Sequence, residues 1–124
     1  MSATILIADD EPNILLSLEF LMQREGYRVL VARDGQEALD AIIEHRPDLV
    51  LLDVMMPRKS GFDVLQALAE RDDPAGLRVL MLTAKGRETD MAKGLALGAS
   101  AYMTKPFSTR ELVDKVRELL GTAA

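Results

Sequence analysis

The sequence predicts an α/β fold, namely a doubly wound, five-stranded parallel sheet with five helices on its two faces. Short apolar runs alternate with stretches of helical spacing along the whole chain. The run 49–52 is unbroken and apolar, which is typical of a strand buried on both sides in a parallel sheet. It ends on Asp53, and Pro57 stops its continuation as strand or helix. Ligands collect beyond the carboxyl ends of such strands, so Asp53 is a candidate site residue.

Five short runs are the expected strands. The run 27–32 is weaker than the others and more polar at its start, which is typical of an edge strand. The expected strands are 4–8, 27–32, 49–52, 79–82 and 101–104.

The helices are expected from amphipathic spacing and from the signals at their ends. Pro12 suits the first position of a helix, because its missing N–H costs little there. Asp34 and Ser108 each stand three residues before a glutamate, the spacing of a capping box. The expected helices run from Pro12 to about Glu25, from Asp34 to just before Pro47, from Gly61 to about Glu70, from about Glu88 to Leu97 and from Ser108 to Gly121.

Composition favours one ordinary soluble domain. The chain has 124 residues, of which 48% are hydrophobic and 28% charged, and it shows no linker, so we assign 1–124 to one domain. No apolar run approaches the ~18 residues of a membrane helix, so we expect no membrane association. The absence of cysteine excludes disulfides and thiolate metal sites and fits a cytoplasmic location. A net charge of −5 argues against direct binding of nucleic acid.

Reactive side chains follow four of the five expected strands. Asp9 and Asp10 come after the first strand, Asp53 after the third, Thr83 after the fourth and Lys105 after the fifth. The carboxyl ends of parallel strands meet at one edge of a sheet, so we expect these side chains to lie together. For each residue alone, a structural role as helix cap or loop residue explains the pattern about as well as a functional role does. A structural role explains the whole set poorly.

The chemistry that this set can perform is narrow. Crowded carboxylates repel one another, so they either stay partly protonated or bind a cation, and carboxylate ligands favour a hard ion such as Mg²⁺. The positive charges of Mg²⁺ and Lys105 would balance three aspartates, and such a site can accept a phosphoryl group. Thr83 adds a hydroxyl donor. Asp53 can act as the nucleophile, since carboxylates form aspartyl phosphates.

These motifs resemble the receiver domain of two-component response regulators. The resemblance rests on Asp9-Asp10-Glu11, on Asp53 with Met55-Met56-Pro57, on Thr83-Ala84 and on Lys105-Pro106, and it covers the whole chain. It implies a flavodoxin-like sheet with strand order 2-1-3-4-5, for which this family is a standard example. It also implies a signalling protein, not an enzyme, although a receiver catalyses its own phosphoryl transfer and slow dephosphorylation.

The resemblance implies a metal site and a phosphoacceptor. Asp53 would accept a phosphoryl group from the phosphohistidine of a sensor histidine kinase or of a phosphotransfer protein. Asp10, Asp53 and the carbonyl oxygen of Met55 would ligate Mg²⁺, and Asp9 would assist through a water molecule.

The resemblance also implies how the phosphoryl group is held. Lys105 and Thr83, helped by the backbone N–H groups of Met55 and Ala84, would bind its oxygens. The Lys105-Pro106 peptide is usually cis in the family, which would aim the ammonium at the site. Met55 and Lys85 flank the expected phosphoryl position and would limit the access of water.

A switch is implied as well. Phosphorylation would draw Thr83 inward, and the aromatic Tyr102 on the last strand would follow; alternatively, Tyr102 simply packs against the sheet edge. Gly94 lies inside the helix after Thr83 and costs about 1 kcal/mol relative to alanine, so we expect this helix to be one of the less stable ones. A weak helix fits a two-state element. The expected signalling face comprises this helix, the last strand and the last helix.

The segment from Lys105-Pro106-Phe107 onward most resembles receivers joined to a winged-helix DNA-binding domain. Such receivers form salt-bridged dimers through the same signalling face. Here Ser100 and Ala101 replace the usual acidic pair and Met91 replaces an expected basic residue, so dimerisation is disfavoured but stays open. The receiver would signal either alone, to a downstream protein, or through an effector domain outside these 124 residues.

Two other functions compete with this interpretation. An aspartate-nucleophile phosphohydrolase usually has a second aspartate two residues after the nucleophile, and that position is Met55 here. A flavin-binding module of similar topology requires a Ser/Thr/Gly-rich phosphate loop after the first strand, where this chain has Asp9-Asp10-Glu11. Both functions are therefore disfavoured.

Overall fold

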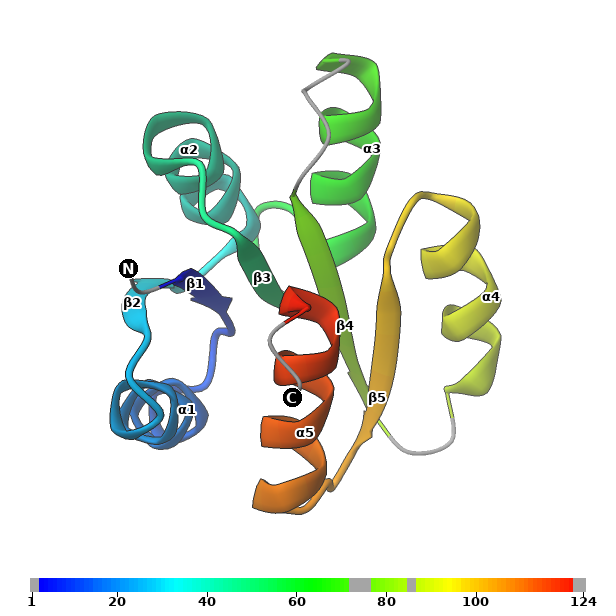
Figure 1. The fold of residues 1–124 in the computed structure, drawn as a ribbon. Coiled ribbons are helices and arrows are strands. Elements are labelled where there is room, and N and C mark those ends of the chain that lie inside the picture. The colour runs from blue at the N-terminus through cyan, green and yellow to red at the C-terminus, as the bar shows by residue number, and fades with distance from the viewer. Residues whose placement is uncertain (1–2, 72–76, 85–86, 122–124) are drawn as a thin grey trace.

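The computed structural model describes residues 3–71, 77–84 and 87–121, in which five strands alternate with five helices (Figure 1). The strands are β1 (Thr4–Ala8), β2 (Arg28–Ala32), β3 (Leu49–Asp53), β4 (Arg78–Ala84) and β5 (Ala101–Lys105). The helices are α1 (Pro12–Arg24), α2 (Gly35–His45), α3 (Gly61–Arg71), α4 (Glu88–Ala96) and α5 (Thr109–Leu120). The turn-rich connection expected at 71–76 lies outside the described residues, except for Arg71.

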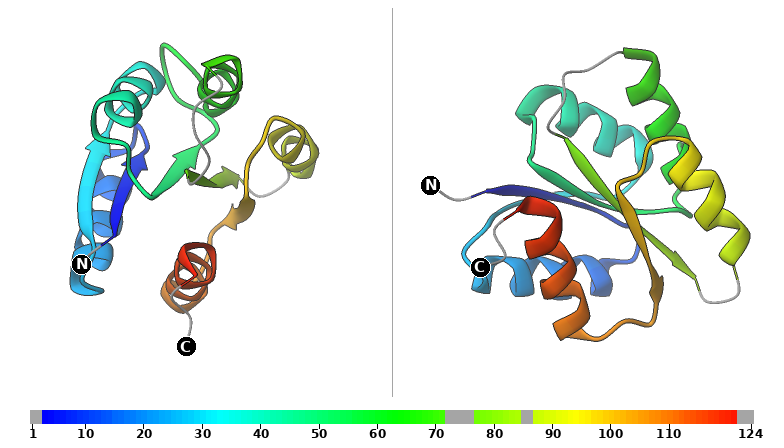
Figure 2. Two further views of the ribbon diagram at one scale, coloured as in Figure 1. Left: turned by 45° about the horizontal axis from the view of Figure 1, so that its top comes forward. Right: turned by 45° about the vertical axis from the view of Figure 1, so that its right-hand side comes forward.

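The strands form one parallel sheet in the order β2-β1-β3-β4-β5. The central strand β3 is buried along its whole length, whereas the edge strands β2 and β5 are partly exposed. Figure 2 shows helices on both faces of the sheet, with α1 and α5 on one face and α2, α3 and α4 on the other. The predicted doubly wound, flavodoxin-like fold and its strand order are therefore confirmed.

Alternating side chains of the buried strands enter two separate cores. On β3, Leu49 and Leu51 belong to the core with α1 and α5, whereas Val50 and Leu52 belong to the core with α2 and α3. Successive side chains of a strand point to opposite faces, so a strand covered on both sides needs an unbroken apolar run. The main helix contributors are Leu15, Leu18, Met22, Leu112 and Val116 in the first core and Ala38, Ile42, Val64 and Leu65 in the second.

Three strands reach further towards the carboxyl edge of the sheet than the apolar runs predict. β3 includes Asp53, β4 continues through Thr83 to Ala84, and β5 includes Lys105. Strand pairing explains the extension, because Thr83 lies opposite Thr104 and Ala84 opposite Lys105. Pairing with a neighbour keeps polar residues in a strand that apolar periodicity alone would end earlier. These residues therefore stand on strand ends and not in loops.

Local caps fix where α2 and α5 begin. The Asp34 side chain accepts a hydrogen bond from the Glu37 N–H at 2.8 Å, and Ser108 accepts one from the Glu111 N–H at 3.0 Å, as the capping boxes predict. One detail differs: the Glu37 side chain accepts from the N–H of Arg33, at 3.1 Å, one residue before the cap.

Two glycines mark places where helices approach other segments closely. A Cβ atom on Gly35, at the start of α2, would overlap the carbonyl oxygen of Lys59 in the loop between β3 and α3. A Cβ atom on Gly94, in α4, would lie 2.6 Å from the sulfur of Met81 on β4. Gly94, which lowers the helix propensity of α4, therefore also allows α4 to pack directly on the sheet.

Gly35→Ala should destabilise the fold more than Gly94→Ala. The methyl group at position 35 would meet a backbone carbonyl that moves only if the loop shifts, and overpacking of this kind costs about 1–3 kcal/mol. The methyl group at position 94 would meet the flexible Met81 thioether, and a gain of about 1 kcal/mol in helix propensity offsets that strain. Urea unfolding measures both free energies, and a larger loss for Gly94→Ala would contradict this packing.

Candidate functional site

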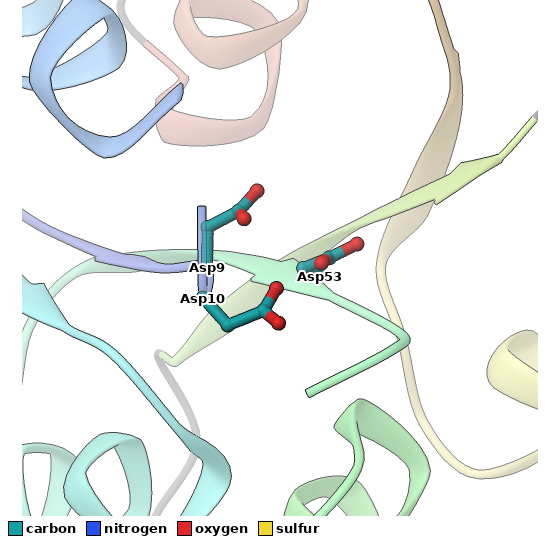
Figure 3. Close-up of side chains that lie close together, drawn as sticks. All are labelled: Asp9, Asp10 and Asp53. Carbon is teal, nitrogen blue, oxygen red and sulfur yellow. The ribbon is translucent and has the colours of Figure 1, made fainter. Parts of the chain in front are cut away.

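The carboxyl edge of the sheet brings three aspartates and a lysine together. Asp9 follows β1, Asp53 ends β3 and Lys105 ends β5. Figure 3 shows the side chains of Asp9, Asp10 and Asp53 close together at the ends of β1 and β3. One carboxylate oxygen of each aspartate lies within 4.8 Å of those of the other two. The fold thus assembles a cluster from residues that are far apart in the sequence.

Asp9 is the most deeply buried member of the cluster. Its exposed fraction is 0%, and both of its carboxylate oxygens have partners. Oδ1 accepts from the Glu11 N–H at 2.9 Å, and Oδ2 accepts from Lys105 Nζ at 3.0 Å. Asp10, in contrast, is exposed to solvent. Asp10 and Asp53 are therefore better placed for direct ligation, and Asp9 for holding its neighbours in place.

Lys105 bridges two of the carboxylates. Its Nζ atom lies 3.0 Å from Asp9 Oδ2 and 3.3 Å from Asp53 Oδ1. Burial by itself would lower the pKa of Lys105, but the attraction and hydrogen bonds of the two carboxylates outweigh burial, so the pKa is raised. The ammonium is charged at neutral pH. The peptide bond between Lys105 and Pro106 is cis, as predicted.

Asp53 is an unusually weak acid. Burial raises the pKa of Asp53 from 3.8 to about 6, with further help from the negative charges of Asp9 and Asp10, while the attraction of Lys105 opposes the shift. Ionised Asp53 therefore costs the folded protein free energy when no cation is bound.

The residues present fit a hard divalent cation. The available ligand atoms are carboxylate oxygens of Asp9, Asp10 and Asp53, and exposed Asp10 leaves one side of the cluster open to solvent. Among the described residues, the three carboxylates of the cluster and the ammonium of Lys105 leave two negative charges, which a divalent cation balances. Mg²⁺ suits such a site, because it binds through one or two carboxylates and keeps several water molecules.

Thr83 has a buried hydroxyl group in need of an acceptor. The residue is 2% exposed, and its Oγ1 atom has no hydrogen-bond partner among the described residues. Thr83 lines a narrow void beneath α4 together with Tyr102 and Met91, and the void is too small for a water molecule. A buried, unsatisfied hydroxyl costs about 1–3 kcal/mol, so a hydrogen bond from Thr83 Oγ1 to an oxygen acceptor at the acidic cluster would be favourable.

The remaining predicted site residues lie at the rim of the cluster. Met55 is the second residue of the loop after β3, with 58% of its surface exposed, and Ala84 ends β4 opposite Lys105. Gly61 closes that loop, since its N–H donates to the Val54 carbonyl at 2.8 Å. Lys85 lies outside the described residues. The roles given to the Met55 and Ala84 backbones stay predictions.

Known proteins resemble this chain over nearly its whole length. The family model of the response regulator receiver domain matches residues 5–117. The chain belongs to this family. Its structure is similar to that of a response regulator from Chloroflexus aurantiacus, with 35% identity, a TM-score of 0.89 and coverage of 98% of this chain and 99% of that chain.

Two further solved structures show the same similarity to this receiver. One is the chemotaxis protein CheY4 of Vibrio cholerae, with 30% identity, a TM-score of 0.88 and coverage of 96% of this chain and 99% of that chain. The other is the receiver domain of a signal transduction histidine kinase from Syntrophus aciditrophicus, with 31% identity, a TM-score of 0.88 and coverage of 97% of this chain and 91% of that chain.

Receiver domains generally bind Mg²⁺ through an acidic cluster, and this receiver has such a cluster. No helix in its described residues is long and apolar enough to cross a membrane.

Sequence reasoning missed one residue beside the site of this receiver. Asp90 on α4 is 8% exposed, lines the same void as Thr83 and forms an ion pair with Arg87, whose Nε lies 2.6 Å from Asp90 Oδ2. A signal was available, because Asp90 and Gly94 are four residues apart and so share one face of the helix. An acid on the packed face of a helix is uncommon unless it is paired.

In the absence of Mg²⁺, Asp53→Asn should stabilise the receiver at pH 7.5 but not at pH 4. The folded pKa of Asp53 is about 6 against 3.8 for the ordinary carboxyl group, so the folded state binds more protons between these values. Stability therefore falls as the pH rises through this window. Asparagine lacks the charge, and the expected gain at pH 7.5 is on the order of 1–3 kcal/mol.

Urea unfolding in EDTA at both pH values measures this gain. Asp63→Asn is the matched control, because the hydrogen bond from the Ser60 N–H lowers the pKa of Asp63 and its charge does not destabilise the fold. An equal gain for both variants, or a gain that persists at pH 4, would show that the charge of Asp53 is not the cause.

Proposed function

We propose that this receiver accepts a phosphoryl group on Asp53 from the phosphohistidine of a sensor histidine kinase or of a phosphotransfer protein, with Mg²⁺ as cofactor. The observation that carries the proposal is the setting of Asp53. It ends the buried central strand, lies beside two further aspartates and stands 3.3 Å from Lys105 Nζ. A nucleophile, a cation site and a fixed positive charge are the parts that phosphoryl transfer requires.

The transfer forms one bond and breaks another. An oxygen of the ionised Asp53 carboxylate attacks the phosphorus atom of the donor. The O–P bond forms as the P–N bond to the donor histidine breaks, and the imidazole leaves with the electron pair and takes up a proton. Because the pKa of Asp53 is about 6, most of the nucleophile is ionised at neutral pH.

The groups around Asp53 stabilise the negative charge on the oxygens of the transferred phosphoryl group. Mg²⁺, when bound, supplies positive charge to the phosphoryl oxygens. Asp9 holds the Lys105 ammonium at 3.0 Å, so little reorganisation is needed for it to meet a phosphoryl oxygen. The Thr83 hydroxyl, which lacks a partner within the described part of the chain, would donate a hydrogen bond to a second phosphoryl oxygen. We assign the N–H groups of Met55 and Ala84 to the remaining contacts.

We propose that the phosphorylated receiver carries a signal and does not turn over an external substrate. The position two residues after Asp53 is Met55, whose side chain offers no acid or base for rapid hydrolysis. Similar structures include a chemotaxis protein and a receiver of a histidine kinase, which both belong to signalling. The expected target is a downstream protein or an attached effector domain, and not nucleic acid bound directly by this domain.

The signal is expected to leave through the face formed by α4, β5 and α5. Thr83 and Tyr102 line one void, and Gly94 of α4 lies in its wall. A move of the Thr83 hydroxyl towards the phosphoryl group would change the space open to Tyr102. Because α4 packs directly on β4 at Gly94, it would have to follow.

Acetyl phosphate with Mg²⁺ should add one phosphoryl group to the wild-type receiver and none to Asp53→Asn. The small donor tests the site without any partner protein, and intact mass spectrometry counts the groups added. Lys105→Met should slow the reaction by about 10²-fold, the scale of losing one fixed group that stabilises the transition state. Asp63 is an exposed aspartate in the first turn of α3, and the variant Asp63→Asn should react like the wild type. A wild-type protein that gains no mass would refute the proposal.

Thr83→Val should stabilise the unphosphorylated receiver and weaken its switch. Valine keeps the shape of threonine but removes the unsatisfied hydroxyl, so we expect a gain of about 1 kcal/mol in the free energy of unfolding. Asp53 should still be phosphorylated, whereas the amide NMR shifts that phosphorylation causes in α4 and β5 should shrink.

Thr104→Val is the control for this substitution. Thr104 pairs with Thr83 in the sheet but is partly exposed, so removal of its hydroxyl should change neither stability nor the amide shifts by much. Full-size shifts in phosphorylated Thr83→Val would rule out Thr83 as the link to α4.

A further inference from the structure

The loop between β3 and α3, residues 54–60, contains a conformational feature that its sequence does not reveal. Arg58 adopts a positive φ of 67°, in the left-handed region that favours glycine. A non-glycine residue keeps this conformation only where its surroundings compensate the strain. The loop contains Met55, whose backbone we assign to Mg²⁺ and the phosphoryl group, so the position of the loop affects the geometry of the site.

The side chain of Arg58 reaches the start of α2. Its Nε atom lies 3.5 Å from Asp34 Oδ2. The Asp34 side chain is 11% exposed and also caps α2, accepting the Glu37 N–H through Oδ1 at 2.8 Å. The two carboxylate oxygens of Asp34 therefore make different interactions: Oδ1 caps α2, and Oδ2 pairs with Arg58 of the loop.

Backbone packing fixes the same part of the loop against α2. The carbonyl of Lys59 lies so close to Gly35 that a Cβ atom there would overlap it. Within the loop, the Lys59 N–H donates to the Pro57 carbonyl at 2.8 Å, which tightens the turn around Arg58. The tip of the loop thus has two attachments to one helix end, the close approach at Gly35 and the ion pair of Arg58.

We infer that Arg58 and Asp34 are positioning residues for the Asp53 site. They hold the loop 54–60 against α2, and through the loop they hold the Met55 backbone beside the acidic cluster. The inference rests on the proposed function for the role of Met55. Neither side chain needs to touch Mg²⁺ or the phosphoryl group.

Arg58→Asn separates this role from a merely structural one. Asparagine tolerates the left-handed conformation without the added freedom of glycine, but it cannot form the ion pair. We expect Mg²⁺ affinity, measured by titration calorimetry, and the rate of phosphorylation by acetyl phosphate to fall roughly two- to five-fold, the range of a partly exposed ion pair. Arg58→Lys keeps the charge and should recover most of the loss.

The chain offers a matched control in Arg46. This arginine also has a positive φ, 49°, but it caps the other end of α2, away from the loop. Arg46→Asn therefore makes the same chemical change in the same backbone conformation and should leave Mg²⁺ affinity and phosphorylation unchanged. An equal effect of the two substitutions, or no effect of Arg58→Asn on either measurement, would overturn the inference.

A double-mutant cycle tests the partner. Asp34→Asn keeps an oxygen that can cap α2 but removes the charge that faces Arg58. If the pair acts as a unit, adding Arg58→Asn to this variant should weaken Mg²⁺ binding no further. Fully additive losses would contradict the coupling. Mg²⁺ affinity reports on the loop even if Asp53 takes no phosphoryl group, so the failure of the proposed function and that of this inference are distinguishable.

Discussion

Charge balance at the carboxyl edge of the sheet is the constraint on which the rest of the structure depends. In the described part of the chain, three aspartates meet there, and Lys105 neutralises only part of their charge. The result is visible in Asp53, since its burial and the nearby Asp9 raise its pKa to about 6. A protein optimised for stability alone would not keep this arrangement, because crowded carboxylates cost free energy without a cation. The same imbalance provides the attraction for Mg²⁺ and for a group that Mg²⁺ and Lys105 can neutralise together.

The acidic cluster is linked to α4 through Thr83 and to α2 through the loop 54–60, and the two links differ in how firmly they are held. On the side of α4, the helix packs closely on the sheet at Gly94, and the buried hydroxyl of Thr83 has no acceptor in the described structure. A new acceptor for this hydroxyl would therefore lower the free energy of the protein. Towards α2, the loop 54–60 is fixed by close backbone packing at Gly35 and by the ion pair of Arg58. One side of the site is therefore suited to change, and the other to holding its geometry constant.

Apolar periodicity was sufficient to predict most of the fold and the meeting of the three aspartates with Lys105. The unbroken run of β3 carries side chains for two cores, so its pattern already requires helices on both faces. Parallel strands in turn require that Asp9, Asp53 and Lys105 meet at one edge, although the sequence separates them widely. Strand ends were less well predicted. β4 continues to Ala84 because it pairs with β5, and pairing depends on a neighbour that periodicity within one segment does not contain.

The sequence by itself therefore determined the layers of the fold, the caps of α2 and α5, and which carboxylates share a site, because these follow from local patterns and strand direction. Only the tertiary structure decided the properties that depend on distance between segments. The burial of Asp90, the close contact at Gly94 and the raised pKa of Asp53 arise from what packs against each residue. The ion pair of Arg58 with Asp34 is of the same kind, since nothing local to either residue specifies that a left-handed turn will bring them together.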